Sequence, residues 1–502
     1  MNNRRMAVNA LSSVAQVAVM SVTLFLLYRY ILRMLGSEQL GIWSMVLATS
    51  SVARVADFGL SGSVTKFASQ YIARGELQVA SALLQTAAVS SAVAVGLVVL
   101  VGYPFFAWVL MLLLHGADFE LALSVLPFSL FSLLANAIGG VFTAGLDAHQ
   151  RIDIRNWILM AWLVVFLLLA FAFTPRYGLL GLAYAQSVQS CGIVVFAWFS
   201  LRRCLKELPL LPHRWDRTLF KEMIGYGMNF QITSVMQMLY DPTTKALLSK
   251  FGGLASVAYF EMANMMVVQL RSFIVSASQV MVPVVSAMKE MHPERIQKLY
   301  RDVFKLVFVL SVPCYTLLVA IAPFGSEIWI GKYEQSFIGF AWLLSVAWFA
   351  NTLSAPAYFA SLGIGKIRWN TISHIVMGGL NISLGIPLGY FFGGTGVVVA
   401  WGISLAIGSR MIVQWYHREY HIGVLGVLDG PTLLVTAAAV LATIFSLASY
   451  FGMRSVASPL MGGILGGAVF VGLILFPMAR HPIVRASYTA LRTVLTGVSR
   501  PS

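Results

Sequence analysis

Residues 80–103 are ASALLQTAAVSSAVAVGLVVLVGY, a stretch without one charged side chain. A helix rises about 1.5 Å per residue, so about 20 apolar residues cross the ~30 Å hydrocarbon core of a membrane. Similar stretches recur along the chain. The fourteen candidates are residues 8–32, 39–62, 80–103, 121–145, 157–174, 179–201, 222–248, 255–285, 303–324, 337–361, 370–391, 395–416, 431–451 and 459–478. They predict an all-α integral membrane protein with about 14 transmembrane helices.

The composition excludes two other classes. Of the 502 residues, 59% are hydrophobic and only 11% are charged. Soluble domains carry about 25% charged residues, so this chain has too few polar groups to cover a water-facing surface, which excludes a soluble enzyme. Disordered chains combine low hydrophobicity with high net charge, and this chain is strongly hydrophobic. A membrane protein is the remaining class.

The positive charge is interpreted as a topology signal rather than as a nucleic-acid site. The chain has 34 Lys and Arg against 19 Asp and Glu, a net charge of +15. Lys and Arg of membrane proteins gather in cytoplasmic loops, and most of them fall on one side when the N-terminus is placed in the cytoplasm. With an even number of helices, both termini are expected in the cytoplasm. The three isolated cysteines and the pattern of histidines predict no disulfide, metal or cofactor.

An internal repeat divides the chain. Pairs of similar residues recur in the same order at offsets of 215 to 221: Leu11–Gln16 with Ile232–Gln237, Gly36 with Gly253, Arg54 with Arg271, Asn136 with Asn351, and Gly178–Gly181 with Gly393–Gly396. Six helices separate the members of each pair, so the halves should share one orientation and be related by an axis along the membrane normal.

This repeat predicts two lobes of six helices each, followed by two further helices. The predicted parts are an N-lobe (1–201), a basic cytoplasmic linker (202–221), a C-lobe (222–416), a cytoplasmic loop (417–430), a helix pair (431–479) and a basic cytoplasmic tail (480–502). No loop is long enough to hold a soluble domain.

Two arginines lie inside predicted spans, Arg54 and Arg271, and the repeat pairs them. A charged side chain at the centre of a spanning helix costs about 2.5 to 3.5 kcal/mol on insertion scales, so it indicates a watery cavity or a substrate path by default. A guanidinium can bind phosphate through two parallel hydrogen bonds. We therefore expect both to face an anionic substrate. The alternative for Arg54 is an ion pair with Asp57, three residues on.

Further candidates for substrate binding or ion coupling are Asp57, Asp241, Lys245 and Glu261. Asp241 and Lys245 are spaced i, i+4 on one helix face, so a local salt bridge explains them equally well. The proline between them is a candidate hinge. Glu261 could contact sugar hydroxyls or a coupling cation, or else pair with Lys245 or Lys250 across helices.

Four short motifs resemble those of a known family: LGSEQLGIW (35–43), DFGL (57–60), GLDAHQR (145–151) and YGLLG (177–181). With them the chain resembles the polysaccharide transporter family of the multidrug/oligosaccharidyl-lipid/polysaccharide exporter superfamily. The resemblance implies two lobes around a central cavity that opens alternately to each side of the bacterial cytoplasmic membrane. It also implies a flippase for undecaprenyl-diphosphate-linked oligosaccharides, used in the assembly of O-antigen, capsule or exopolysaccharide. In such a flippase, Arg54 and Arg271 would be the ligands of the diphosphate.

The partners implied are the lipid-linked oligosaccharide, membrane lipid and other polysaccharide assembly proteins, with no nucleic acid. Three alternatives remain. A multidrug cation antiporter of the superfamily tends to carry acids in its cavity, whereas here the buried candidates are arginines. A lipid II flippase is expected to carry a further Arg-Asp pair on the first helix, which this chain lacks. A membrane polymerase or ligase would need a sizeable outer loop for catalysis, and the predicted outer loops are short.

Overall fold

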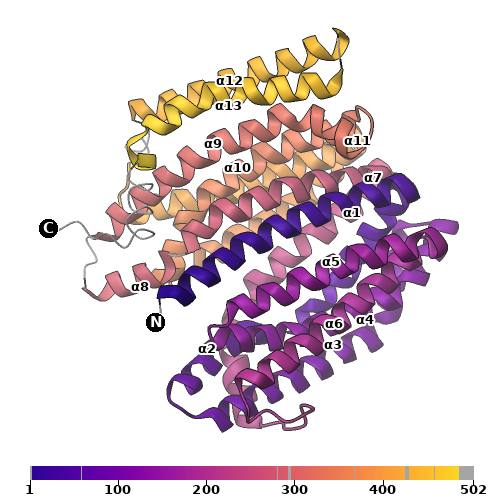
Figure 1. Cartoon of the computed structure of the whole chain (residues 1–502), viewed down its shortest axis with the longest axis vertical. Coiled ribbons are helices and arrows are strands. Elements are labelled where there is room, and N and C mark those ends of the chain that lie inside the picture. The colour runs from indigo at the N-terminus through magenta and orange to yellow at the C-terminus, as the bar shows by residue number, and fades with distance from the viewer. Residues whose placement is uncertain are drawn as a thin grey trace. The chain divides into compact units, whose positions relative to one another are not determined.

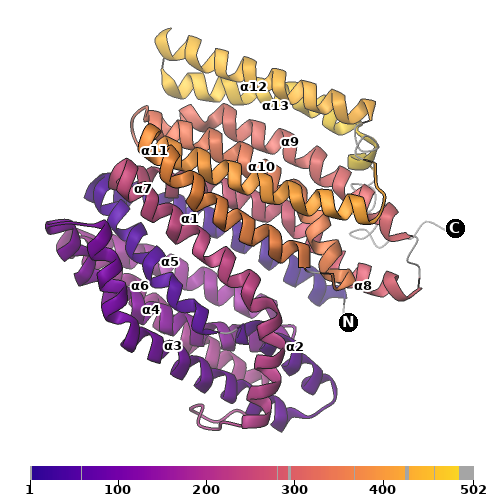
Figure 2. The ribbon, with the colours of Figure 1, turned by 180° about the vertical axis from the view of Figure 1, so that it is seen from behind.

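The computed structural model describes residues 3–57, 59–279, 281–291, 295–366, 368–423, 429–456 and 458–485. These ranges are mostly helical and contain no strand, which confirms the all-α class (Figures 1 and 2). The elements are α1 (Asn3–Ser51), the 3-10 helix η1 (Val52–Asp57), α2 (Leu60–Ala73), α3 (Leu77–Leu113), α4 (Ala117–Ala148), α5 (Ile152–Tyr177), α6 (Leu179–Cys204), α7 (Arg217–Gln279), α8 (Met281–Met291), α9 (Ile296–Trp329), α10 (Gln335–Ile364), α11 (Arg368–Glu419), α12 (Gly430–Val456) and α13 (Pro459–Arg480).

In the described part of the chain, eleven helices are long and apolar enough to cross a membrane. The chain is therefore a multi-pass membrane protein. Three of the helices, α1, α7 and α11, each contain one range predicted from sequence and all or part of the next, because the helix continues through a kink. The number of fourteen crossings stays a prediction.

The kinks repeat between the two halves of the sequence. Gly36 interrupts α1 with φ 83° and ψ 175°, and Gly253 interrupts α7 with φ 77° and ψ 170°. Gly178, between α5 and α6, has φ 57° and ψ −134°, and Gly393 inside α11 has φ 61° and ψ −145°. Positive φ values of this kind favour glycine, which has no Cβ. The residues that the sequence repeat pairs thus adopt matching backbone conformations.

Close helix contacts repeat in the same way. A Cβ added to Gly181 would lie 2.5 Å from the carbonyl oxygen of Phe173, and one added to Gly396 would lie 1.9 Å from that of Leu388. In each half the helix after the turn therefore passes directly against the backbone of the helix before it. Only glycine fits this approach.

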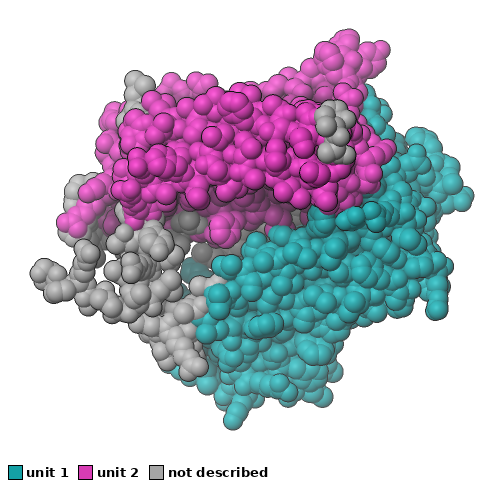
Figure 3. Space-filling model, turned by 45° about the horizontal axis from the view of Figure 1, so that its top comes forward, with its two compact units in different colours: residues 1–258 teal, residues 259–502 magenta. Residues whose placement is uncertain are grey.

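The chain divides into two compact units, residues 1–258 and 259–502 (Figure 3). The helix α7 passes from the first unit into the second. This division describes packing, whereas the predicted lobe boundary at 202–221 describes the sequence repeat and stays a prediction.

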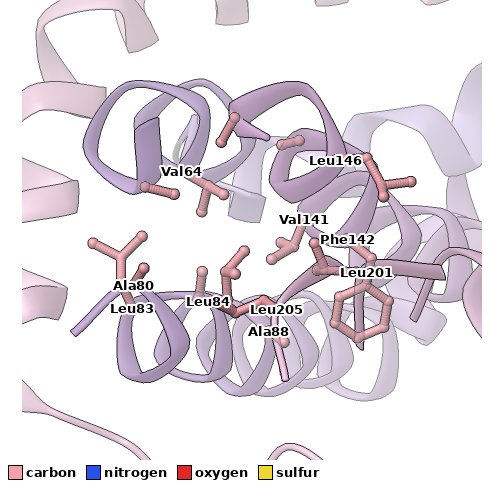
Figure 4. Packing of buried hydrophobic residues seen from close by; sticks show 14 of the residues in the cluster. Val64, Ala80, Leu83, Leu84, Ala88, Val141, Phe142, Leu146, Leu201 and Leu205 are labelled. Atoms are coloured by element: carbon pink, nitrogen blue, oxygen red, sulfur yellow. The ribbon is translucent and has the colours of Figure 1, made fainter. Parts of the chain in front are cut away.

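The first unit has a hydrophobic core in which α4 packs against both α3 and α6. The helix α2 contacts α3 and α4. Leu83 and Leu84 of α3 meet Val141 and Phe142 of α4, and Leu201 comes from α6 (Figure 4). These side chains are at most 2% exposed. Their burial follows from the apolar runs that predicted the spans.

In the second unit, α12 and α13 lie side by side as a pair against α9 (Figures 1 and 2). They occupy the predicted range 431–479. Ala439 and Ala442 of α12 and Phe470 of α13 pack on Val312 of α9. A polar contact supports the same junction, since Lys305 of α9 pairs with Asp429 just before α12.

The sequence predicts one helix over 39–62, and the structure differs. The α-helix ends at Ser51, six residues follow as a 3-10 helix, and α2 begins after Gly59, whose φ is 68°. The hydroxyl groups of Ser50 and Ser51 donate to the carbonyl oxygens of Val46 and Ala48, at 2.8 and 2.7 Å. Such bonds compete with the helical ladder. Arg54 therefore lies on a 3-10 turn rather than on an α-helix.

Replacing either matched glycine should destabilise the protein. Gly181→Ala and Gly396→Ala each place a Cβ against backbone, and overpacking of this kind costs about 1 to 3 kcal/mol. We expect both variants to lower the melting temperature of the detergent-purified protein. Gly62→Ala is the control, because Gly62 lies in α2 with nothing within 4 Å of an added Cβ. Unchanged melting of both test variants would contradict the close approach.

Candidate functional site

Arg271 lies on α7, in the second unit, with its side chain half-buried. Its Nε donates a hydrogen bond of 2.9 Å to Oδ1 of Asn351 on α10. The guanidinium carbon also lies 4.8 Å from the ring centre of Trp348, one helical turn before Asn351. A cation over an indole ring is attracted by the negative charge of the ring face. One face of α10 thus holds the arginine by an amide and an aromatic ring.

Further contacts fix these two partners in place. Asn351 Nδ2 donates to Oγ of Ser409 on α11, at 2.9 Å. Trp348 Nε1 donates to Oδ1 of Asn264 on α7, also at 2.9 Å, and its ring packs edge to face on Trp401 with the ring centres 5.5 Å apart. Each partner is thus oriented by its own hydrogen bond. Because both partners are neutral, they hold the arginine without neutralising its positive charge.

In the part of the chain that the structure describes, Arg271 has no carboxylate within ion-pair distance. Within the same residues its two Nη atoms have no hydrogen-bond partner, and neither atom is fully buried. The sequence places no acid one helical turn from Arg271, so its partner has to come from another helix, from water or from a ligand. The structure supplies a neutral partner for Nε and leaves the Nη fork available. That fork has the geometry that binds a phosphate through two hydrogen bonds.

Arg54, the other predicted diphosphate ligand, lies on η1 in the first unit with an exposed side chain. Among the described residues it has no ion pair. The side chain of Asp57, its alternative partner, lies outside what the structure describes. Arg54 and Arg271 belong to different units, so the cavity that they are expected to share stays a prediction.

Asp241 and Lys245 form the local ion pair that their spacing predicts, with 2.8 Å between Oδ2 and Nζ. Lys245 is 4% exposed, whereas the Asp241 side chain is 46% exposed. Their role in binding or coupling stays a prediction. The helix α7 runs through Pro242 and breaks at Gly253, so the kink lies beyond the proposed hinge. Glu261 follows that kink and is half-buried.

Sequence reasoning missed the residues that hold Arg271. In the sequence, Asn351 stands out only as a repeat match to Asn136, and nothing singles out Trp348. The repeat did carry a signal, because Asn136 Nδ2 donates to Ser190 Oγ at 3.1 Å just as Asn351 donates to Ser409. An asparagine inside an apolar span is costly unless it is hydrogen-bonded, and this could have indicated a structural contact in both halves.

Among the described residues no group of three or more His, Cys, Asp or Glu gathers as a metal site.

The fold is that of the multidrug/oligosaccharidyl-lipid/polysaccharide exporter superfamily. An inward-facing multidrug resistance MATE family transporter superimposes with a TM-score of 0.68 at 16% identity, over 80% of this chain and 94% of that one. The lipid II flippase MurJ, in an inward closed conformation, gives 0.67 at 13% identity, over 94% and 99% of the two chains. An outward-facing MATE transporter gives 0.59 at 16% identity, over 82% and 95%.

The sequence model described as "Polysaccharide biosynthesis protein" matches residues 6–289. Since this range is more than half of the chain, the chain belongs to that family, which confirms the resemblance of the four motifs. A comparison with curated proteins gives no significant match.

Variants of Asn351 should separate its structural contribution from the charge of Arg271. Asn351→Ala removes the acceptor, and losing a hydrogen bond to a charged group costs about 1.5 to 3 kcal/mol, so we expect a lower melting temperature. Asn351→Asp replaces the amide by a carboxylate, which should bind the guanidinium more strongly and keep or raise the melting temperature. Equal destabilisation by both variants would contradict the contact.

Proposed function

We propose that the chain is a flippase that moves an undecaprenyl-diphosphate-linked oligosaccharide from the cytoplasmic to the periplasmic leaflet of the bacterial inner membrane. The repeat unit would serve the assembly of O-antigen, capsule or exopolysaccharide. The two halves would open alternately to each side, and both termini would lie in the cytoplasm. The protein would act as a transporter and not as an enzyme. Family membership and the fold support the class, and the charged site supports the substrate.

The observation that carries this proposal is the Arg271 guanidinium, held by an amide and an indole ring with its Nη atoms unpaired among the described residues. A diphosphate cannot cross hydrocarbon unaided, because an unpaired charge in that medium costs many kcal/mol. A fixed cation in an accessible position lowers that cost. We propose that Arg54 supplies a second cation from the other half, and that the prenyl tail stays in lipid.

The remaining candidates have subordinate roles in this proposal. Glu261 and Asp57 are the acids that could bind a coupling H⁺ or Na⁺, and Asp241 with Lys245 could contribute polar contacts. A multidrug antiporter of the MATE type is the alternative that the fold equally allows. A fixed arginine favours an anionic cargo over a cationic drug, because like charges repel.

Export of surface glycan in cells tests the role of the arginines. Arg271→Ala should abolish export at normal protein level, because the diphosphate loses its fixed cation. Arg271→Lys keeps the charge but loses the two-pronged hydrogen bonding, so we expect partial export. Arg54→Ala should also reduce export.

The matched control is Arg301→Ala, which removes an exposed arginine from α9. It should export as the wild type does. Accumulation of lipid-linked units on the cytoplasmic leaflet should accompany the loss, which distinguishes a flippase from a polymerase or ligase. Normal export by Arg271→Ala would overturn the proposed role of this residue.

A further inference from the structure

A cavity with charged and aromatic side chains in its lining lies in the second unit, and none of the residues that contact Arg271 lines it. Its volume is about 410 Å³, within the range of small-molecule sites. It lies where α10 ends and where α11 both begins and ends. The lining side chains used below are Lys366, Arg368, Trp369, Trp415, Glu419 and Tyr420.

The cavity is expected to lie at the surface of a membrane, because it lies at the ends of apolar helices. The apolar helix α10 ends at Ile364, and α11 starts at Arg368, turns at Gly393 and ends at Glu419. The cavity therefore gathers the ends of three apolar stretches on one side. Trp, Tyr, Lys and Arg concentrate at this level of membrane proteins, where apolar rings meet lipid and charges meet head groups.

Two indole rings form one wall. Trp369 and Trp415 stack with their ring centres 3.6 Å apart and their planes 11° apart, which joins the first and last turns of α11. A cation flanks each ring. The guanidinium carbon of Arg368 lies 5.8 Å from the Trp369 ring centre, and that of Arg418 lies 5.8 Å from the Trp415 ring centre.

The charge of this cavity is positive. Lys366 donates to Oε1 of Glu419 at 2.6 Å, and this hydrogen bond raises the pKa of Lys366, so the lysine is fully charged at neutral pH. Within the described ranges, Arg368 and Arg418 have no ion pair. The lining thus contains two cations, Lys366 and Arg368, and one carboxylate, Glu419. An anion would bind Arg368 directly and compete with Glu419 for Lys366.

We propose that this cavity binds the phosphate head group of a membrane lipid. Arg368 would hold the phosphate by two hydrogen bonds, Lys366 would add a second charge, and the stacked indoles would contact the glycerol or prenyl portion just below. This inference goes beyond the proposed transport and does not rest on it. Two lipids present this chemistry, an anionic phospholipid and the diphosphate-bearing carrier.

Lipid binding can be counted by native mass spectrometry of the purified protein in neutral detergent, titrated with phosphatidylglycerol. Arg368→Ala should weaken the tightest binding step about tenfold, as expected for one lost charge-assisted contact. Glu419→Gln should tighten it, because it frees Lys366 for the ligand. Opposite effects of two exposed substitutions are not expected from a purely structural role.

The matched control is Arg301→Ala, which removes the same charge outside the cavity and should bind as the wild type does. Phosphatidylcholine and inorganic phosphate should bind more weakly than phosphatidylglycerol. Displacement of phosphatidylglycerol by farnesyl diphosphate would assign the site to the carrier lipid, and retention would assign it to phospholipid. Wild-type binding by both Arg368→Ala and Glu419→Gln would overturn the proposal.

Discussion

The hydrogen bond from Arg271 to Asn351 lets a positive charge lie between apolar helices. A carboxylate at position 351 would neutralise the guanidinium, and an apolar residue would leave its Nε without an acceptor. The amide does neither: it orients the arginine and leaves its charge available. Trp348 acts in the same way, because an aromatic face attracts a cation without cancelling it. The proposed substrate follows from this balance, since an anion is what completes the site.

Glycines shape the long helices in both halves of the sequence. In a bilayer every backbone N–H and C=O has to be satisfied within the protein, so a helix can turn only where the backbone tolerates it. Gly36 and Gly253 kink α1 and α7 at equivalent places, and Gly253 lies upstream of Arg271 on the same helix. The repeat is therefore a repeat of backbone conformation, and it also pairs the two arginines, Arg54 and Arg271.

The sequence predicts the class, the apolar spans and the paired glycines, because these depend on composition and on local backbone requirements. It does not predict that α1 ends at Ser51 and that Arg54 lies on a 3-10 turn, because no glycine or proline marks this change between Gly41 and Gly59. Nor does it predict Asn351 and Trp348 beside Arg271. In a long apolar helix the sequence does not show which face meets which neighbour, so partners across helices emerge only from the structure.

The residues of the family motifs mainly allow turns and close contacts between helices. In LGSEQLGIW, a Cβ on Gly41 would lie 2.2 Å from the carbonyl oxygen of Leu254, and in GLDAHQR, one on Gly145 would lie 2.8 Å from both Leu84 and Leu201. Asp147 of GLDAHQR forms an ion pair with Arg155, with 2.5 Å between Oδ2 and Nη1. These residues maintain turns and close helix contacts. They identify the family, while the cargo depends on side chains elsewhere.

The most direct test of this account is transport by the purified protein in vesicles. A lipid-linked oligosaccharide with a diphosphate linkage would be incorporated, and its exposure to a sugar-degrading enzyme outside the vesicles would be followed over time. The account predicts that wild-type protein exposes the sugar of both leaflets, and that Asn351→Asp, with its guanidinium neutralised, exposes only the outer leaflet while remaining folded. Transport by Asn351→Asp at the wild-type rate would contradict the claim that an uncompensated arginine carries the diphosphate.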